Sequence, residues 1–196
     1  MARLGRVMAP STANTITFFF AMLALVAAAT TIAIVVSALS DDRFGIIGAL
    51  RPVALELATV VATTSMVGSL ILSEAIGYVP CLNCWIQRAF MYPAALLLMA
   101  ALVSKRLILA KLAGVLAVLG LPVAIFHRVE QAIGTEIGGI CDDAAPCSAR
   151  WVNHFGFMTI PTMAGCGFAA IIALVAIAVW RRQELPAEAE RVAVTV

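Results

Sequence analysis

The sequence predicts an all-α integral membrane protein with five transmembrane helices. Hydrophobic residues make up 63% of the 196 residues and charged residues only 12%, whereas a soluble domain holds about 45–50% apolar and 25% charged residues. The mean hydropathy is +1.03. The apolar residues also form long runs that are separated by short polar joints, as expected of spans that cross a bilayer. The charge of +2 is small and scattered, which excludes a nucleic-acid-binding surface.

The apolar runs define the expected helices in order. They cover residues 16–39, 57–77, 89–103, 107–126 and 161–180. The third run is short for a span, but Trp85 and Ile86 can extend it. The fourth carries Lys111 near one end, where a long side chain can reach the membrane surface. The segment after Arg182 is polar and is predicted to be disordered.

Two cysteine pairs lie in joints on the same side of the membrane. Cys81 and Cys84 separate the second and third spans, while Cys141 and Cys147 separate the fourth and fifth, and two crossings return the chain to its starting side. The opposite side receives eight of the 13 Lys and Arg residues, including the tight joint at 105–106, and is therefore predicted to be cytoplasmic. Both pairs are expected outside, where disulfides persist.

The first span departs locally from this charge rule. Five spans with a cytoplasmic C-terminus place Arg3 and Arg6 outside. The alternative is a cleavable signal peptide within residues 1–40. Cleavage would reverse the parity and turn Cys81 and Cys84 toward the cytoplasm, so a retained span is preferred.

The Cys-x-x-Cys sequence at Cys81 and Cys84 stands where the third span begins. If Cys84 lies in the first helical turn, the helix dipole favours its thiolate, and Arg88 adds positive charge on the same face. Such a thiolate is expected to donate electrons. A structural disulfide and half of a four-cysteine zinc site remain alternatives. A haem attachment site is excluded, because Trp85 occupies the position that requires histidine.

The second pair, Cys141 and Cys147, lies in a glycine-rich, acidic loop that is expected to be flexible. A disulfide in so short a loop supplies only about 2 kcal/mol by the chain-entropy estimate. Accessible sulfurs beside small residues suit exchange with a partner thiol. The spacing alone leaves structural and redox roles equally open.

Three further features have ordinary explanations from the residues alone. His127 fits an interfacial histidine that faces lipid headgroups. The stretch 150–157 carries aromatic residues and fits either a short helix on the membrane surface or an aromatic belt. Cys166, between Gly165 and Gly167, fits close packing of helices.

Several motifs occur together in a specific order. They are Gly68-Ser69-Leu70 with Ser73-Glu74, Pro80-Cys81-x-x-Cys84-Trp85-x-Gln87-Arg88, Met91-Tyr92-Pro93, His127-x-x-Glu130-Gln131, Cys141…Cys147, and Trp151-x-Asn153-x-Phe155-Gly156-Phe157-x-Thr159-Ile160-Pro161. This series resembles the DsbB family, with its Gram-positive BdbC branch as the closer likeness.

The resemblance implies a four-helix transmembrane bundle, and this chain departs from the family by one extra N-terminal transmembrane helix. Residues 54–182 would form the DsbB-like redox domain. Residues 1–53 would add the extra helix and a cytoplasmic joint, and residues 183–196 a disordered cytoplasmic tail. The implied location is the bacterial inner membrane, as a multi-pass protein whose cysteine pairs face the periplasm or cell exterior.

The implied function is a quinone-dependent thiol oxidase. Cys84 would face a quinone, either ubiquinone or menaquinone, with Arg88 and His127 beside the quinone oxygens, while Cys81 relays electrons to Cys84. Glu130 and Gln131 would anchor a loop. No metal is expected.

The implied partner is a DsbA-like oxidase of the thioredoxin fold. Cys141 would form the mixed disulfide with it, and Cys147 would exchange with Cys81. A vitamin K epoxide reductase-like protein is disfavoured, because its loop cysteines precede the Cys-x-x-Cys. A non-enzymatic membrane protein with structural disulfides is the alternative from another class. Export of reducing equivalents would require cysteines in an inner loop, and the sequence has none there.

Overall fold

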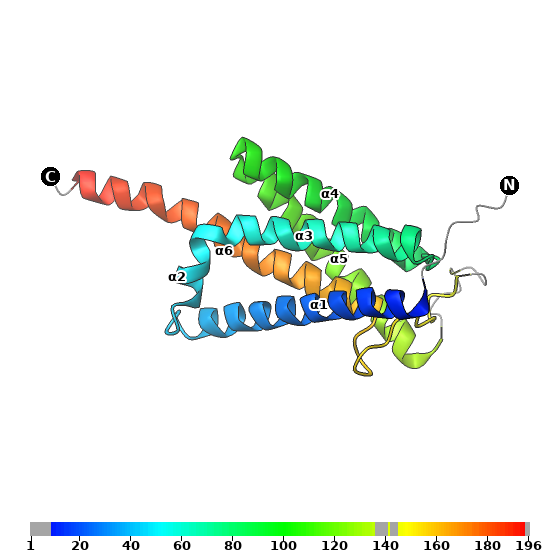
Figure 1. Ribbon diagram of the computed structural model, residues 1–196. Helices are drawn as coiled ribbons and strands as arrows, with labels where there is room; N and C mark the ends of the chain where they lie inside the picture. Colours follow the sequence, from blue (N-terminus) through cyan, green and yellow to red (C-terminus); the bar gives the residue numbers. More distant parts are fainter. Residues whose placement is uncertain (1–8, 136–140, 142–144, 195–196) are drawn as a thin grey trace.

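The computed structural model describes residues 9–135, 141 and 145–194. Across these residues the chain is helical and contains no strand, and five of the described helices are long and apolar enough to cross a membrane. The long helices run side by side as a bundle, with the first helix along one side (Figure 1). The expectation of five apolar helices is therefore confirmed. The membrane-crossing part of the last one, Ile160–Val179, nearly matches the predicted run.

Helix α1 (Pro10–Leu39) begins one and a half turns before the predicted apolar run. Pro10 stands at its start, where a missing N–H costs nothing. At its end Asp42, with φ of +54°, receives hydrogen bonds from Ser37 Oγ at 2.5 Å and from the backbone N–H groups of Ile47 and Gly48 at 3.0 Å. Asp42 thereby accepts from N–H groups in the first turn of α2 (Ile46–Leu50), the short helix that turns the chain back and whose N-cap residue is Gly45.

The second membrane-crossing segment, Ile46–Ala75, joins four elements end to end. After α2 come a 3-10 turn, η1 (Arg51–Val53), helix α3 (Ala54–Leu70) and a π-helical turn, η2 (Ile71–Ala75). Gly77 follows with φ of +88°, a conformation that ends helices and suits glycine.

Helices α4 (Leu82–Ser104) and α5 (Leu107–Ile133) are both longer than the predicted apolar runs. The N-terminal extension of α4 places Cys84 in the first helical turn, as expected. The C-terminal extension of α5 adds two turns beyond Phe126, so His127, Glu130 and Gln131 lie on a helix. Polar side chains shortened the apolar runs in the sequence, although the helices continue through them.

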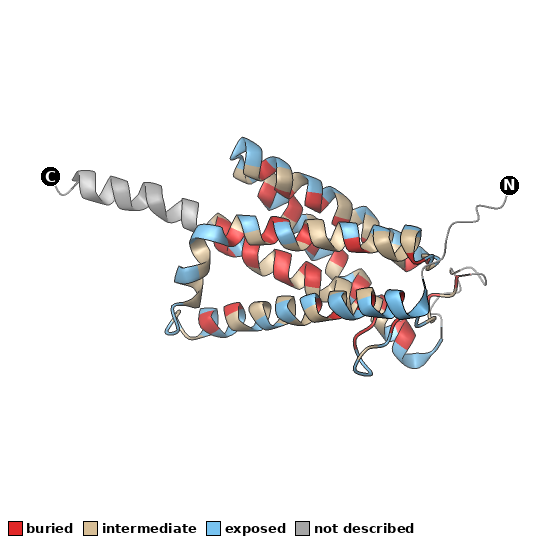
Figure 2. Ribbon diagram, viewed as in Figure 1, coloured by how far each residue is buried: buried red, intermediate tan, exposed pale blue. Residues whose placement is uncertain are grey.

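Helix α6 (Ile160–Val194) is the central helix of the bundle. It packs against α1, α3 and α5, while α4 packs against α3 and α5. Small residues permit these close contacts: many of the core positions are alanines, among them Ala54, Ala58, Ala62, Ala94, Ala113 and Ala117. Figure 2 shows the buried positions turned inward on the inner helices, whereas α1 presents mostly exposed and intermediate positions.

The C-terminal part of α6 differs from the predicted disordered tail, because the backbone remains helical through Val194. Alanine, glutamate, glutamine and arginine are good helix formers. The segment also continues an existing helix and needs no new nucleus.

The segment 150–157 is not a helix, so of the two interpretations left open by the sequence, a surface helix or an aromatic belt, the surface helix is excluded. His154 and Met158 instead pair through two backbone hydrogen bonds of 3.0 and 2.8 Å. Phe155 and Gly156 between them have φ of +56° and +77°, which is the conformation of a tight turn. The sequence signal for this turn was Gly156.

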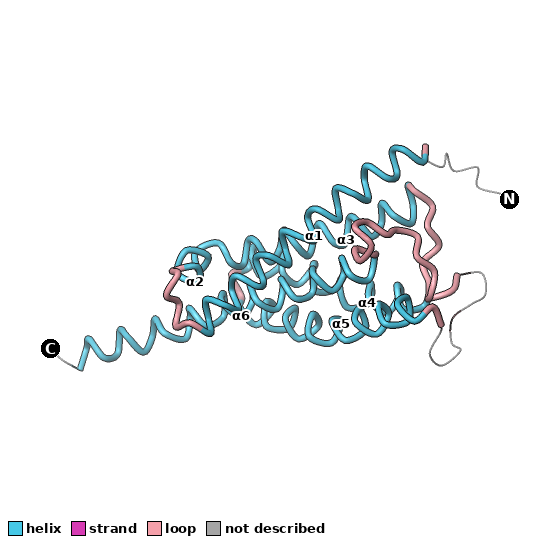
Figure 3. Tube along the Cα trace, turned by 90° about the horizontal axis from the view of Figure 1, so that it is seen from below, coloured by secondary structure: helices cyan, strands magenta, loops and turns pink. Residues whose placement is uncertain are grey.

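Both cysteine-bearing segments lie at the end of the bundle where α1 begins, and the chain leaves at the other end (Figures 1 and 3). Two crossings therefore return the chain to the same end, as predicted. Arg3 and Arg6, which were predicted to lie outside, are not among the described residues.

Candidate redox site

Cys81 and Cys84 lie at the N-terminus of α4. Cys81 is the N-cap residue and Cys84 the third residue of the helix, so a backbone hydrogen bond of 3.1 Å from Trp85 N to Cys81 O closes the first turn around them. Both are free thiols, and their Sγ atoms are 3.0 Å apart. Cys81 is 6% exposed. The helical turn thus holds the two sulfurs close enough to form a disulfide with little movement.

His127 on α5 joins the two cysteine pairs. Its Nε2 lies 3.6 Å from Cys81 Sγ and 3.1 Å from the carbonyl oxygen of Cys147. Because a carbonyl only accepts, Nε2 carries the proton, and Nδ1 then accepts from Gln87 Nε2 at 3.0 Å. His127 is 2% exposed, so an interfacial histidine that faces headgroups is excluded.

The thiol of Cys81 is strongly acidified. A hydrogen bond from the Cys84 thiol is the largest cause, and the hydrogen bond from His127 adds to it, so the pKa of Cys81 falls to about 4 despite its burial. Since two sulfurs at 3.0 Å share a proton, the reduced pair carries one negative charge. The sequence placed the favoured thiolate on Cys84, but the structure adds His127, which faces Cys81.

Cys141 and Cys147 form a disulfide, with their Cα atoms 5.9 Å apart. Cys147 is fully buried, whereas Cys141 is partly exposed. Accessible sulfurs were expected in this loop, and that expectation is wrong for Cys147, which the end of α5 covers. Residues 136–140 and 142–144 of this loop lie outside the described part. While Cys141 and Cys147 form this disulfide, neither sulfur is available to a four-cysteine zinc site.

Polar residues on α5 hold the segment after Cys147. Gln131 Nε2 donates to the carbonyl of Ala149 at 2.8 Å. The guanidinium of Arg150 donates back to the carbonyl of Gln131, with Nε at 2.8 Å. The predicted loop-anchoring role of Gln131 is therefore confirmed.

Glu130, the other predicted anchor, is 1% exposed and accepts a hydrogen bond of 2.5 Å from Asn83 Nδ2. This contact joins α5 to the residue between the two cysteines of α4. It fixes the start of α4 against α5, because a buried carboxylate is retained where its hydrogen bonds are satisfied.

A cavity of about 420 Å³ opens on the other side of Cys84. Its polar end contains Cys84, Gln87, Arg88 and Ser69, and the rest is lined mainly by apolar residues of α1, α3 and α6. Arg88 donates to Ser69 Oγ at 2.9 Å through Nε and to the Ser69 carbonyl at 3.0 Å through Nη2. A guanidinium is thus held beside Cys84.

Two aromatic residues stand at this polar end. Tyr78 and Trp151 line the cavity and stack with ring centroids 5.6 Å apart. Trp151 belongs to the stretch after Cys147, so the stack connects that stretch to the segment before Cys81. His127 is not among the lining residues of this cavity, but its Nδ1 contacts Gln87, which is one of them.

The same cluster contains a set of metal-ligand atoms. The ligand atoms of Cys81, Cys84 and His127 lie within 4.8 Å of one another. Two thiolates and an imidazole are a donor set that soft divalent metals accept. The buried position of Cys81 and His127, next to a second cysteine pair, fits redox chemistry as well.

Asn83, Gln87 and Ser69 are site residues to which the sequence pattern assigned no role. Asn83 and Gln87 are one helical turn apart on α4, and each faces a polar residue of α5. A signal was available, since amide side chains in an apolar helix require partners. Cys166 packs near Ala21, Ala24 and Met158, and a Cβ on Gly167 would come 3.0 Å from Ser65 Oγ, so close packing is confirmed there.

Comparison with known proteins agrees with this site. The family "Disulfide bond formation protein DsbB" matches residues 51–181, about two thirds of the chain. A "Disulfide bond formation protein C" from Bacillus subtilis is 39% identical over 124 residues, which are 62% of this chain and 89% of that protein. No solved structure matches the chain.

Two further relatives have similar descriptions. A "Probable disulfide formation protein" from Oceanobacillus iheyensis is 40% identical over 115 residues, 58% of this chain and 79% of that protein. A "Probable disulfide formation protein C 2" from Bacillus anthracis is 35% identical over 135 residues, 69% of this chain and 96% of that protein. The family match covers both cysteine pairs, Arg88 and His127. This bacterial membrane protein is therefore a disulfide-forming oxidoreductase, and the chain belongs to the DsbB family.

Proposed function

We propose that the protein reoxidises a DsbA-like oxidase of the thioredoxin fold and passes the electrons through its two cysteine pairs to a membrane quinone. The observation that carries this proposal is the position of His127, whose imidazole contacts Cys81 of one pair and the Cys147 carbonyl of the other. Helix α4 then presents Cys84 to an apolar cavity.

The exchange with the partner begins at Cys141. Its sulfur is the more exposed of its disulfide, so a partner thiolate attacks Cys141 Sγ, forms a mixed disulfide and releases Cys147 as a thiolate. The second partner thiol then displaces Cys141 and leaves with the partner disulfide. The partner has lost two electrons and two protons, and Cys141 and Cys147 have gained them.

The internal exchange takes place in a buried site. Cys147, at the His127 side, attacks Cys81 of the Cys81–Cys84 disulfide and releases Cys84 as a thiolate. Cys141 then attacks Cys147, restores the loop disulfide and releases Cys81, whose acidified thiol is a good leaving group. His127 holds a proton on Nε2 beside the Cys81 sulfur and is a positioning residue for this step.

The cavity beside Cys84 fits a quinone. It is long and apolar, as an isoprenoid tail requires, and its polar end has hydroxyl, amide and guanidinium groups that suit quinone oxygens. Two nitrogens of Arg88 bond Ser69, and Nη1 has no hydrogen bond within the described residues. A bound ubiquinone or menaquinone would supply a sink for two electrons and two protons. Cys84 and Arg88 would hold it, and Ser69 keeps Arg88 in place.

We place the cysteine-bearing end of the bundle outside the bacterial inner membrane. The joint between α4 and α5 carries Lys105 and Arg106 at the opposite end, and positive charge favours the cytoplasm. A DsbA-like partner in the periplasm or at the cell exterior would then reach Cys141.

The test uses the full chain in detergent with a reduced thioredoxin-fold oxidase. Ubiquinone or menaquinone reduction is followed by ultraviolet absorbance, and the mixed disulfide by non-reducing gels. We expect Cys84→Ser to abolish quinone reduction, and Cys141→Ser to abolish the mixed disulfide while quinone binding persists. Cys166→Ser is the matched control and should retain turnover. Turnover in Cys84→Ser would refute the relay, and no reduction of either quinone would favour structural disulfides.

A further inference from the structure

Helix α1 is outside the region that matches the family, which begins at residue 51, yet it is attached to the redox end of the bundle. Thr17 Oγ1 and His154 Nε2 are hydrogen bonded at 3.0 Å. Phe18 contacts the rings of His154 and Phe155, with centroids 5.7 and 5.8 Å apart. The turn that precedes α6 therefore fixes the beginning of α1.

The next two turns of α1 pack on α6. Ala21 and Ala24 are 0% and 7% exposed and cluster with Met158, with Met163 and Cys166 of α6 beside them. Small side chains bring the two helices close together. Helix α3 packs on α6 as well, and the cavity beside Cys84 lies between α1 and α3.

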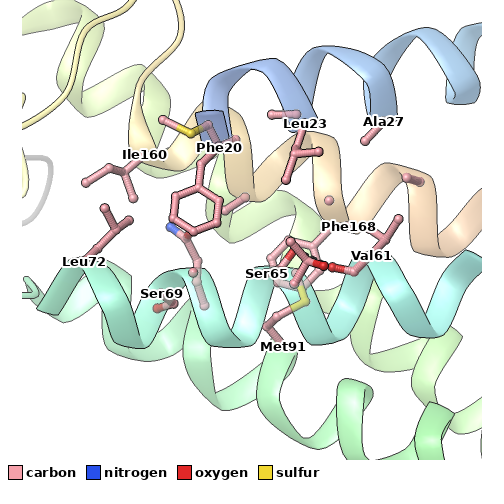
Figure 4. Close-up of a pocket in the computed structure, with 18 of the residues that line it drawn as sticks. Phe20, Leu23, Ala27, Val61, Ser65, Ser69, Leu72, Met91, Ile160 and Phe168 are labelled. Atoms are coloured by element: carbon pink, nitrogen blue, oxygen red, sulfur yellow. Dashed lines mark hydrogen bonds between the residues drawn. The ribbon is translucent and has the colours of Figure 1, made fainter. Parts of the chain in front are cut away.

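One face of α1 lines this cavity along its length. The lining residues are Phe20, Leu23, Ala24, Val26, Ala27 and Thr30. Positions 20, 23, 27 and 30 follow one another at intervals of three or four residues, so they lie on one side of the helix, and Ala24 and Val26 flank them. Figure 4 shows Leu23 and Ala27 above the cavity, opposite Val61 and Ser65 of α3. The cavity thus has an inner wall from the family domain and an outer wall from α1.

Phe20 reaches the polar end. A Cβ on Gly68 would lie 3.0 Å from Phe20 Cε1, so the glycine leaves room for the ring. Ser69, the next residue, holds Arg88. In Figure 4 the Phe20 ring points from α1 toward Ser69. An aromatic ring therefore lies next to the groups that would hold a quinone ring.

We propose that α1 is the outer wall of the quinone site, where Phe20 borders the ring and the face around Ala27 borders the isoprenoid tail. This inference rests on the proposed function. Seven residues separate Phe20 from Ala27, which is about 10 Å along a helix. The two positions therefore act on different parts of one ligand, and their variants are expected to discriminate quinones with and without a tail.

The test compares Ala27→Phe with Ala29→Phe. Ala27 lines the cavity, whereas Ala29 is exposed on another face of the same helix. Quinone binding to the purified full chain is measured by quenching of tryptophan fluorescence, because Trp151 lines the cavity. The probes are menaquinone and ubiquinone, together with menadione and the tail-less ubiquinone ring. This readout needs no turnover.

We expect Ala27→Phe to raise the Kd of the tailed quinones about tenfold and to leave the tail-less rings unchanged. Ala29→Phe should bind all probes as the unmodified protein does. Phe20→Ala should weaken both classes, since it removes a ring contact. Equal Kd values of the tailed quinones in Ala27→Phe and Ala29→Phe would refute the proposal that α1 is the outer wall of the quinone site. The absence of quenching in the unmodified protein would refute it as well. Quinone binding without turnover would refute the electron relay, but it would not affect the conclusion that α1 borders the quinone site.

Discussion

The acidity of Cys81 determines how strongly the inner pair oxidises. Its pKa of about 4 arises first from the Cys84 thiol and next from His127. A depressed thiol pKa stabilises the reduced pair as a thiolate, and a stable reduced form makes the corresponding disulfide a stronger oxidant. The thiolate stabilises the reduced pair fully at pH values above the ordinary pKa of a thiol. This stabilisation is lost as the pH falls to about 4.

A titration of the reduced thiols tests the two causes separately. In a Cys166→Ala background, thiolate absorbance should show a midpoint near pH 4. His127→Ala should move it upward by about one pH unit, because one donor is lost. Cys84→Ala should move it further, since it removes the larger cause. A midpoint that His127→Ala leaves in place would show that the imidazole does not act on Cys81.

Arg88 affords a second prediction at this scale. It lines the cavity and is held by Ser69. Arg88→Ala should raise the Kd of a quinone about tenfold in the fluorescence titration, because a charged donor is lost. The Cys141–Cys147 disulfide should remain, since Arg88 makes no contact with it. Arg150→Ala is the matched control, as Arg150 bonds Gln131 instead. An unchanged Kd would remove Arg88 from the site.

Among the elements, the α5–α6 contact depends on a missing side chain. A Cβ on Gly120 of α5 would collide with the ring of Phe168 on α6, which is fully buried. Gly120→Ala should therefore lower the stability by about 1–3 kcal/mol through overpacking. A Cβ on Gly165 would come only within 3.8 Å of Ala124 Cβ, an ordinary contact, so Gly165→Ala is the control. Thermal unfolding in detergent measures both, and equal midpoints would contradict the packing argument.

The apolar runs in the sequence predicted which segments form helices better than they predicted where each helix begins and ends. Each apolar run became a helix, because a bilayer leaves few alternatives for the backbone. The apolar runs are shorter than the helices where polar residues belong to a helix end, as at Asn83 near the start of α4 and Glu130 near the end of α5. These residues are polar because they bond each other across the two helices. Apolar composition alone carries no information about such pairs.

The turn at 155–156 was missed for a different reason. Aromatic residues four apart suggested a helical face, but Phe155 and Gly156 both adopt positive φ. Gly156 was the local signal for a turn. The turn matters because His154 holds α1 through Thr17. No local pattern in residues 10–30 indicates that contact, since its two residues are 137 positions apart.

At the scale of the whole molecule, five crossings gather both cysteine pairs at one end. Counting spans predicted this arrangement. It did not predict that His127 lies between Cys81 and Cys147, since α5 had to continue past its apolar run to bring the imidazole there. The family resemblance identified the cysteines expected to react. Only the structure shows that Cys147 is buried and Cys141 is more exposed.

The orientation of this end yields the last prediction. Single cysteines are introduced by Thr135→Cys, beside the disulfide loop, and by Ser104→Cys, beside Lys105 and Arg106, in a chain whose five native cysteines are alanine. Both positions are exposed. A thiol reagent that does not cross membranes should label Thr135→Cys in intact cells and Ser104→Cys only after lysis. Positive charge at the α4–α5 joint demands this order, because transfer of Lys105 and Arg106 across the membrane is costly. The reverse pattern would place Cys141 in the cytoplasm, where a DsbA-like partner cannot reach it.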